Sequence, residues 1–364
     1  MALTYKVKLS DVCTIKYGKD HKVLKDGLYP VYGTGGIMRY VNEFIYDEAS
    51  VLIPRKGTLS NIFYVDEPFW TIDTLFYTQI DKSKIWPKYL YYYLKRFNFD
   101  EMNVGTAVPS LTTALLNELE LKIPSLNKQK KILDFLLPFD QKIETNNAII
   151  ANLEAQAQAI FKSWFVDFEP FQDGGFVESE LGMIPEGWEV KTISEFSHVT
   201  SGKRPMKRLE DGDVPIYGAN GQTGWTDEVL IDKSCILIGR VGTLGSVQRL
   251  NDKIWASDNT LVFTSADYEF LYFQLKRIDY AAYNRGSTQP LITQGDIKNI
   301  KVIYPNNVVM EKFSNVVGLY FDLIWQLEKQ NKNLAQIRDT LLPKLMSGEI
   351  RVVQDEVEEI ENPL

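Results

Sequence analysis

Two stretches of the chain carry apolar side chains at the alternating three- and four-residue spacing of a paired helix. In each stretch the a and d positions of a heptad are mostly apolar, so one seam along the helix has to be buried. The first seam comprises Ile143, Asn146, Ile150, Leu153, Ala157, Ile160 and Trp164. The second comprises Ile324, Leu327, Asn331, Leu334, Arg338, Leu341 and Leu345. We predict two helices of roughly 35 to 40 residues that pair along these seams.

An asparagine interrupts each seam, Asn146 in the first and Asn331 in the second. A polar residue at such a position fixes the register of a helix pair at some cost in stability. The alternative interpretation is that each helix packs on its own globular domain and the seams do not meet.

A region of a different kind precedes each helix. Short runs of β-forming residues, such as 51–53, 62–65 and 76–78, are separated by glycine-rich turns such as 33–36. A short stretch at helical spacing follows in each region. The pattern predicts two irregular β-rich domains, each followed by a long helix.

The two halves of the chain repeat one another. Residues 29–33 return as 214–218 and Trp70 returns as Trp255, both at an offset of 185, whereas Pro124 and the helical seams return at an offset of 181. A repeat of this length indicates two similar domains rather than a solenoid. We expect an α+β fold with two α/β domains in tandem and two long helices that form an antiparallel, pseudo-two-fold coiled coil.

The expected domain limits follow from these patterns. The domains are 1–125 and 188–305, the helices 126–166 and 306–348, and the acidic linker and tail 167–187 and 349–364. A domain with an outgoing helix, followed by a domain with a returning helix, has approximate two-fold symmetry. Duplex DNA has the same symmetry, so two such domains would meet two short sites separated by an unread gap.

The net charge of −8 at first argues against a nucleic-acid partner. Twelve acidic residues lie in 167–189 and in the tail from residue 353 onward, however, and without them 40 basic residues face 36 acidic ones, a balance of +4. Basic residues gather at the same place in each repeat: Lys16, Lys19, Lys22 and Lys25, then Lys203, Arg204, Lys207 and Arg208. Phosphate binding needs a local field rather than a basic total; ordinary solvated lysines remain the alternative.

Only two cysteines occur, Cys13 and Cys235, at non-equivalent places. We therefore expect no disulfide framework and a reducing, cytoplasmic location. No signal peptide or bilayer-spanning run is recognisable, which predicts a soluble intracellular protein.

Three segments carry a resemblance to a known family. They read FKSWFVDFEP at 161–170, SELGMIPEGW at 179–188 and LLPKLMSGEI at 341–350. Together, and in this order, they resemble the hallmark segments of the specificity subunit (HsdS family) of Type I restriction-modification enzymes. Ile123-Pro124, followed by Gln129 and Ile132, is similar to the family's entry into its first spacer helix.

The resemblance implies a non-catalytic subunit with two target-recognition domains that bind double-stranded DNA at a bipartite, asymmetric target. It also implies that the helices dock two methyltransferase (modification) subunits, which bind S-adenosylmethionine and methylate adenine. Restriction subunits, which use ATP and Mg²⁺, would join through them. No cofactor and no metal is expected in this chain.

The absence of enzyme motifs from the sequence agrees with that expectation. The sequence contains no G-x-x-x-x-G-K-[ST] loop and no N-P-P-Y or D-P-P-Y segment. A self-contained DNA nuclease or methyltransferase is one alternative, because Asp173, Glu189 and Lys191 have roughly the spacing of a metal-dependent cluster. A two-headed protein-interaction adaptor is the other.

Candidate DNA contacts follow from the turns in each repeat. Hydroxyl, amide and basic side chains on glycine-rich loops are suited to reading bases; their alternative role is turn formation. In the first domain these residues are Tyr32, Thr34, Lys56, Thr58, Thr106 and Ser110. In the second domain they are Tyr217, Asn220, Arg240, Thr243, Ser287, Thr288 and Gln289. For phosphate contacts we favour Lys19, Lys22, Lys203 and Arg204.

Overall fold

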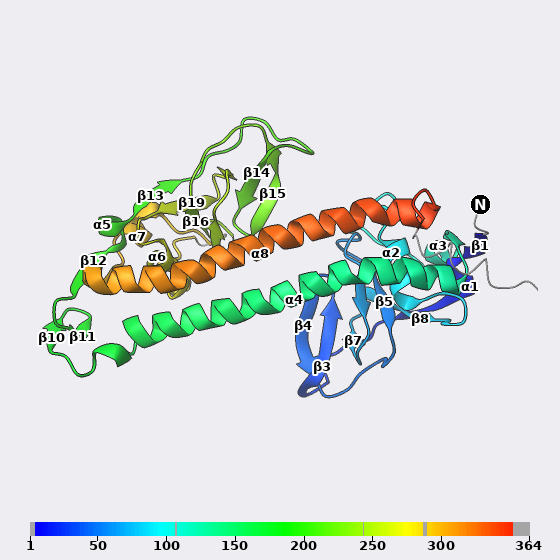
Figure 1. Cartoon of the computed structure of the whole chain (residues 1–364), viewed down its shortest axis with the longest axis horizontal. Coiled ribbons are helices and arrows are strands. Elements are labelled where there is room, and N and C mark those ends of the chain that lie inside the picture. Colours follow the sequence, from blue (N-terminus) through cyan, green and yellow to red (C-terminus); the bar gives the residue numbers. More distant parts are fainter. Residues whose placement is uncertain (1–3, 106–107, 243, 287–289, 352–364) are drawn as a thin grey trace, which may run out of the picture. The chain divides into compact units, whose positions relative to one another are not determined.

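The computed structural model describes residues 4–105, 108–242, 244–286 and 290–351. The chain divides into two compact units, one formed by residues 1–144 with 332–364 and the other by residues 145–331. Two long helices, α4 (Leu126–Phe165) and α8 (Asn307–Ser347), each contribute one end to each unit (Figure 1). Each unit therefore combines one β-rich domain with a pair of helix ends.

The first domain contains three small sheets. A four-stranded antiparallel sheet has the order β2-β8-β5-β6, formed by Cys13–Tyr17, Leu75–Ile80, Ser50–Pro54 and Phe63–Val65. A three-stranded sheet has the order β4-β3-β7, formed by Gly36–Val41, Asp26–Gly33 and Trp70–Thr71. β1 (Tyr5–Lys8) pairs with β9 (Glu120–Ile123), and the short helices are α1 (Leu9–Val12), α2 (Pro87–Leu94) and α3 (Thr113–Asn117).

The second domain repeats this topology. Its four-stranded sheet β13-β19-β16-β17 is formed by His198–Ser201, Thr260–Thr264, Cys235–Gly239 and Val247–Leu250. Its three-stranded sheet β15-β14-β18 is formed by Gly221–Thr226, Val214–Gly218 and Trp255–Ala256. β12 (Glu189–Thr192) pairs with β20 (Lys301–Tyr304), and the helices are α5 (Ile193–Phe196), α6 (Tyr268–Lys276), η2 (Tyr280–Tyr283) and α7 (Gln294–Lys298).

Strand register is repeated as well as strand order. In the parallel pairs, Val31 lies opposite Trp70 in the first domain and Ile216 lies opposite Trp255 in the second. Both partners are offset by 185 residues, as in the sequence. The expectation of an α+β chain with two similar domains and two packed helices is confirmed.

One of the two central strands of each larger sheet, β5 or β16, is buried throughout because both of its faces are covered. Successive side chains of a strand point to opposite faces. Val51 and Ile53 of β5 enter the main core of the first unit, whereas Leu52 enters a smaller cluster with Phe69. Ile236, Leu237 and Ile238 of β16 divide in the same way.

The helix ends share these main cores. In the first unit, Leu136 of α4 and Leu345 of α8 pack in one cluster with Tyr89 of α2. In the second unit, Phe161 of α4 and Phe321 of α8 pack with Phe273 of α6. Within each unit the helices run antiparallel, since early residues of α4 meet late residues of α8 in the first unit and the reverse holds in the second. Burial of these shared faces, rather than helix propensity, stabilises the long helices.

Asn146 and Asn331 meet in the second unit. The Asn146 side chain is buried, and its Nδ2 donates to Oδ1 of Asn331 at 2.8 Å and to Oε1 of Gln330 at 2.7 Å. The Asn331 Nδ2 in turn donates to Oδ1 of Asn147 at 2.8 Å. Moving the helices past each other would leave a buried amide without acceptors, so these contacts fix the register.

The three family-like segments lie at the helix ends. After α4 the chain turns at Phe168, which has a φ of 55°, and passes through η1 (Glu169–Phe171) to the hairpin β10-β11 (Phe176–Ser179, Gly182–Pro185). Trp188 then packs on the rings of Phe165, Phe168 and Phe171, with centroids 5.0 to 5.8 Å away. α8 ends at Gly348, with φ of 80°, where Ile350 N donates to Lys344 O at 3.1 Å.

None of the helices in the described ranges has the length and apolar character needed to cross a membrane.

Candidate nucleic-acid interface

Three loops that are distant in sequence meet in the first domain: 33–36 after β3, 55–62 after β5 and 103–111 after α2. Gly57 N donates to Pro109 O at 3.0 Å, and Leu111 N donates to Arg55 O at 2.9 Å. The Asn61 side chain donates to the carbonyl of Thr34 at 3.1 Å. These contacts hold the three loops together as one surface.

The equivalent loops meet in the second domain. Gly242 N donates to Pro290 O at 3.0 Å, and Ile292 N donates to Arg240 O at 3.0 Å. The Gln248 amide donates to the carbonyls of Gly218 at 2.8 Å and Ala219 at 3.0 Å. The two domains thus present loop surfaces with the same backbone connections and different side chains.

One asparagine holds the last loop in each domain. Asn103 Oδ1 accepts from Gly105 N at 2.7 Å and from Ser110 N at 2.8 Å. Asn284 Oδ1 accepts from Gly286 N at 2.9 Å and from Leu291 N at 3.0 Å. The sequence analysis missed both residues, although their offset of 181 places them in the repeat.

The candidate base-reading residues of the first domain lie on the joined loops or directly beside them, and they differ in exposure. Lys56 and Thr58 are exposed, and Thr34 and Ser110 are half-buried. Tyr32 is half-buried, with its ring beside Phe63 and Phe69. Burial, assisted by the nearby Glu67, raises the pKa of Tyr32 to about 12, so its hydroxyl stays a hydrogen-bond donor. Thr106 lies outside the described residues.

In the second domain, Asn220 is exposed in the turn between β14 and β15, and Arg240 is half-buried at the end of β16. Tyr217 matches Tyr32, and burial raises its pKa too. Thr243, Ser287, Thr288 and Gln289 lie outside the described residues.

The candidate phosphate-binding residues are exposed on a loop that is held identically in the two domains. The backbone N of Lys19 donates to Thr71 O, and that of Lys203 donates to Ala256 O, both at 2.8 Å. Their carbonyls accept from the indoles of Trp70 at 3.0 Å and Trp255 at 2.7 Å. Among the residues that the structure describes, no carboxylate pairs with Lys19, Lys22, Lys203 or Arg204.

A family model described as the Type I restriction modification DNA specificity domain matches residues 4–155 and 185–332 of this chain. Its two matches cover both β-rich domains and most of both long helices. The chain belongs to the Type I restriction-modification specificity-subunit family.

Individual relatives agree. The chain is 30% identical over 344 residues to the Type I restriction enzyme MjaIX specificity subunit of Methanocaldococcus jannaschii, covering 85% of this chain and 79% of that one. It is 28% identical over 338 residues to the HindI specificity subunit of Haemophilus influenzae, covering 69% and 73%. The crystal structure of a Type I restriction-modification S subunit from M. genitalium has the same fold, with a TM-score of 0.58, 21% identity and coverage of 95% and 96%.

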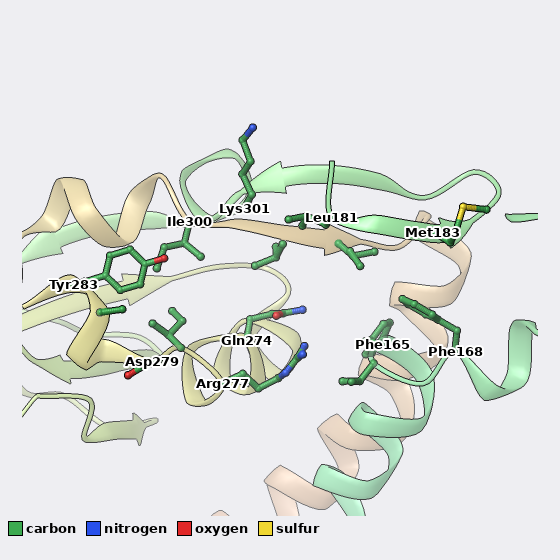
Figure 2. Close-up of a pocket in the computed structure, with 15 residues that line it drawn as sticks. Phe165, Phe168, Leu181, Met183, Gln274, Arg277, Asp279, Tyr283, Ile300 and Lys301 are labelled. Carbon is green, nitrogen blue, oxygen red and sulfur yellow. The ribbon is translucent and has the colours of Figure 1, made fainter. Parts of the chain in front are cut away.

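The second unit of this specificity subunit also contains a groove of about 530 Å³ beside the β10-β11 hairpin. Figure 2 shows Phe165 and Phe168 at one end, Tyr283 at the other, and between them Gln274 of α6 and Arg277, which directly follows α6. Its described lining includes none of the candidate DNA contacts. The groove is therefore separate from the loop surface of the second domain.

Two members of the nuclease-like trio considered as an alternative, Glu189 and Lys191, pair with each other. Lys191 Nζ lies 3.3 Å from a carboxylate oxygen of Glu189 and 4.1 Å from the ring centroid of Tyr304, whereas Asp173 is exposed in a turn. Over the described ranges, no group of three or more His, Cys, Asp or Glu side chains is arranged to hold a metal ion.

Proposed function

We propose that this specificity subunit reads a bipartite, asymmetric DNA target, with one domain on each half-site. The observation that carries the proposal is that one loop framework occurs twice with different side chains. Thr34, Lys56 and Ser110 of the first domain correspond to Ala219, Val241 and Leu291 of the second. Two frames that are alike in backbone but different in hydrogen-bonding groups suit two half-sites of different sequence.

The division of labour within the chain follows the two kinds of element. Residues 1–125 and 188–305 act as target-recognition domains, and 126–166 and 306–348 act as spacer helices that set the gap between the half-sites. Residues 167–187 and 349–364 are the linker and the tail. Exposed Lys19, Lys22, Lys203 and Arg204 bind phosphates and position the protein, while the joined loops contact base edges.

Exposed apolar side chains on the helices support a second role in docking. On α8, Val316, Leu319 and Leu323 are spaced along one face, and Leu319 is 68% exposed. On α4, Phe135 is 41% exposed and occupies the position equivalent to Val316. Apolar groups at equivalent places on two helices suit two copies of one partner. That partner is the methyltransferase subunit, with restriction subunits joining through it, and S-adenosylmethionine, ATP and Mg²⁺ belong to those subunits.

Docking is tested by changing one exposed side chain. Leu319→Glu should weaken co-purification of the methyltransferase subunit, because it places a charge within an apolar contact. Lys329→Glu, an exposed change on the same helix but off the face of Val316, Leu319 and Leu323, serves as the control. Equal co-purification of both variants and the unchanged chain would count against this surface.

Target recognition is tested by mapping methylated adenines across the genome in cells that express the methyltransferase partner with and without this chain. We expect a split, asymmetric motif with a fixed gap that appears only when the chain is present. If methylation is unchanged while the methyltransferase is active, the recognition proposal fails and the adaptor alternative replaces it.

A further inference from the structure

Arg55 and Arg240 occupy the same position in the two domains, within the similar segments VLIPRKGTL (51–59) and ILIGRVGTL (236–244). Each directly follows the central strand, β5 or β16. Arg55 N donates to Thr74 O at 2.8 Å and Arg240 N donates to Asn259 O at 2.9 Å. Both carbonyls accept from the last joined loop, as described above. The two side chains therefore leave equivalent, firmly held points of the loop surfaces.

Both arginine residues are half-buried, and neither guanidinium has an ion-pair partner within the described part of the chain. Arg55 Nη1 donates only to a carbonyl, Asp73 O, at 3.1 Å. Arg240 Nε is buried and finds no hydrogen-bond acceptor among the described residues. No carboxylate lies within ion-pair distance of either guanidinium across those same residues. Removing a charged donor such as Arg240 Nε from water without an acceptor is costly, which indicates that a ligand supplies the acceptor there, and Arg55 occupies the equivalent place in the first domain.

Another arginine of the first domain shows what a structural arginine looks like. Arg39 on β4 donates to a carboxylate oxygen of Asp26 at 2.7 Å and to Leu24 O at 3.1 Å. Its charge is satisfied inside the domain. Arg55 and Arg240 lack such a partner, and this difference separates the two classes.

Geometry distinguishes a base from a phosphate as the missing acceptor. The Arg55 guanidinium lies 5.3 Å from the ring centroid of Tyr17, whose hydroxyl is 3.4 Å from Thr113 Oγ1. A planar fork held by a stacked ring and a fixed backbone is suited to a bidentate contact with O6 and N7 of guanine. Phosphates are served by the exposed side chains of Lys19, Lys22 and Lys203.

We propose that Arg55 and Arg240 each read one guanine, Arg55 in the half-site of the first domain and Arg240 in that of the second. This inference rests on the proposed function and adds that each half-site contains a G·C pair recognised from an equivalent place. A single substitution should therefore change one base position in one half-site and leave the other half-site intact.

The first experiment maps adenine methylation in cells that express the full chain with its methyltransferase partner. Arg55→Ala should relax the first half-site at one G·C position, with a roughly 10- to 100-fold loss of preference, and Arg240→Ala should do the same in the second. Arg55→Lys keeps the charge but not the fork, so it should retain methylation and still lose much of the preference. Arg39→Ala is the matched control and should leave the motif unchanged.

The second experiment modifies the DNA rather than the protein. Binding of the complex to a duplex carrying the identified motif is compared with binding to the same duplex with 7-deazaguanine, which lacks the N7 acceptor, at the assigned position. The unchanged chain should bind the modified duplex roughly tenfold or more weakly, and the Arg55→Ala chain should not distinguish the two.

Several results would overturn the inference. A uniform loss of methylation with an unchanged motif would mean a phosphate contact, and a half-site without any G·C pair would remove the ligand. Indifference of the unchanged chain to 7-deazaguanine at every guanine of the motif would have the same effect. Absence of any split motif from the unchanged chain would instead refute the proposed function, so the two failures are distinguishable.

Discussion

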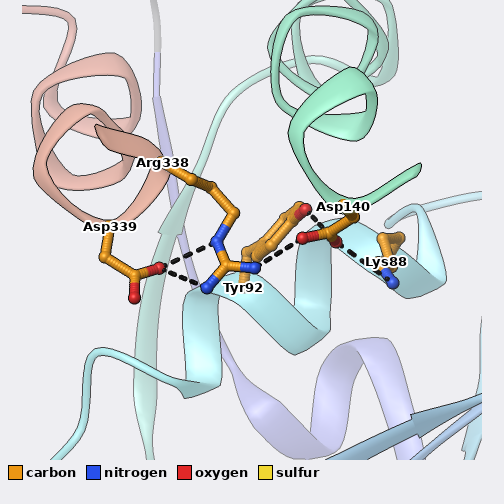
Figure 3. Close-up of polar contacts among 5 residues, drawn as sticks. All are labelled: Lys88, Tyr92, Asp140, Arg338 and Asp339. Carbon is orange, nitrogen blue, oxygen red and sulfur yellow. Dashed lines mark hydrogen bonds and ion pairs between the residues drawn. The ribbon is translucent and has the colours of Figure 1, made fainter. Parts of the chain in front are cut away.

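At equivalent positions, the contacts between domain and helix ends are charged in the first unit and apolar in the second. In the first unit, Asp140 of α4 accepts from the hydroxyl of Tyr92 and from Nη1 of Arg338, both at 2.5 Å, and Lys88 Nζ is 3.4 Å away. Figure 3 shows Arg338 of α8 lying between Asp140 and Asp339. A shift of 181 residues places Phe273, Phe321 and Ala157 at the corresponding positions of the second unit.

In the second unit these positions form an aromatic cluster. Phe273 stacks on Phe161 with ring centroids 5.0 Å apart and contacts Phe321 at 5.8 Å. Lys88 is replaced by Glu269, which is half-buried. One fold thus joins a domain to the helix pair by a charged network at one place and by apolar packing at the other.

The difference teaches that the backbone repeat does not dictate which interactions stabilise it. An aromatic cluster derives its stability from buried area and tolerates small shifts. A nearly buried charged network adds little net stability, but it strongly penalises any arrangement in which one member lacks its partner. The two junctions should therefore respond differently to substitution and to pH.

The largest effect is expected from Phe161→Ala. Phe161 is only 2% exposed and contacts the rings of Phe165, Phe270, Phe273 and Phe313. Its removal should lower the free energy of unfolding of the second unit by about 3 to 5 kcal/mol. Hydrogen exchange of the amides in residues 145–165, measured with urea unfolding of the whole chain, reports this loss.

Phe135→Ala provides the control, because this phenylalanine lies on the same helix and is 41% exposed. Its cost should stay near or below about 1 kcal/mol. Equal costs for the two substitutions would show that the aromatic cluster does not stabilise the second junction.

A smaller effect is expected from Arg338→Ala at the first junction. The substitution leaves Asp140 nearly buried with only Tyr92 and Lys88 for compensation. Because both side chains of the pair keep some contact with water, at 13% and 11% exposure, the loss should be about 2 to 3 kcal/mol, below the range of a fully buried pair. Hydrogen exchange of residues 126–144 measures it.

The comparison is tested further by placing the apolar residues of the second junction at the equivalent positions of the first. The triple variant Tyr92→Phe, Asp140→Phe, Arg338→Ala copies Phe273, Phe321 and Ala157 into the first junction. It should recover most of the stability that Arg338→Ala loses, since apolar groups replace the nearly buried carboxylate and guanidinium together, while Lys88 keeps the ring of Tyr64, 4.3 Å from its Nζ. A triple variant less stable than the single one would mean that the network contributes net stability that apolar packing cannot replace.

The sequence predicted the repeat, the two helices and the pairing of their seams, because each depends on local spacing. Arg338 stood in the second seam as an unexplained charge. Its partner Asp140 lies beside the first seam, 198 residues away, and no local pattern connects them. The loops that carry the candidate phosphate-binding residues could be predicted as exposed. The joining of loop 55–62 to loop 103–111 could not, because it depends on backbone hydrogen bonds that only the folded domain brings together.

Arg55 illustrates the same limit at the candidate site. The sequence pattern favours Lys56 as a basic side chain on a glycine-containing loop, whereas Arg55 stands out only through the offset of 185 that relates it to Arg240. Half-burial without a carboxylate cannot be inferred from composition, since it depends on where Asp73, Tyr17 and the last loop lie after folding.

The smallest effect concerns pH, and it has opposite signs at the two junctions. Burial raises the pKa of the Asp140 carboxyl, but the hydrogen bonds from Tyr92 and Arg338 and the charge of Lys88 outweigh burial and hold it below its usual value. Burial raises the pKa of Glu269, and the nearby Asp322 adds to this shift. A depressed carboxyl pKa contributes stability that is present at neutral pH and lost as the pH falls through the folded value; a raised one disfavours the folded state at neutral pH.

Acidification from pH 7 toward the ordinary glutamate value of 4.5 should therefore slightly stabilise the second junction and leave the first unchanged. Only below the ordinary aspartate value of 3.8 should the first junction lose stability. Hydrogen exchange of the two helix ends, corrected for the intrinsic exchange rate at each pH, separates them. Glu269→Gln should abolish the gain in the second unit because the glutamine does not titrate. If the second junction still gains stability on acidification in that variant, another carboxyl is responsible. The replacement of Lys88 by Glu269 would then not explain the different pH responses of the two junctions.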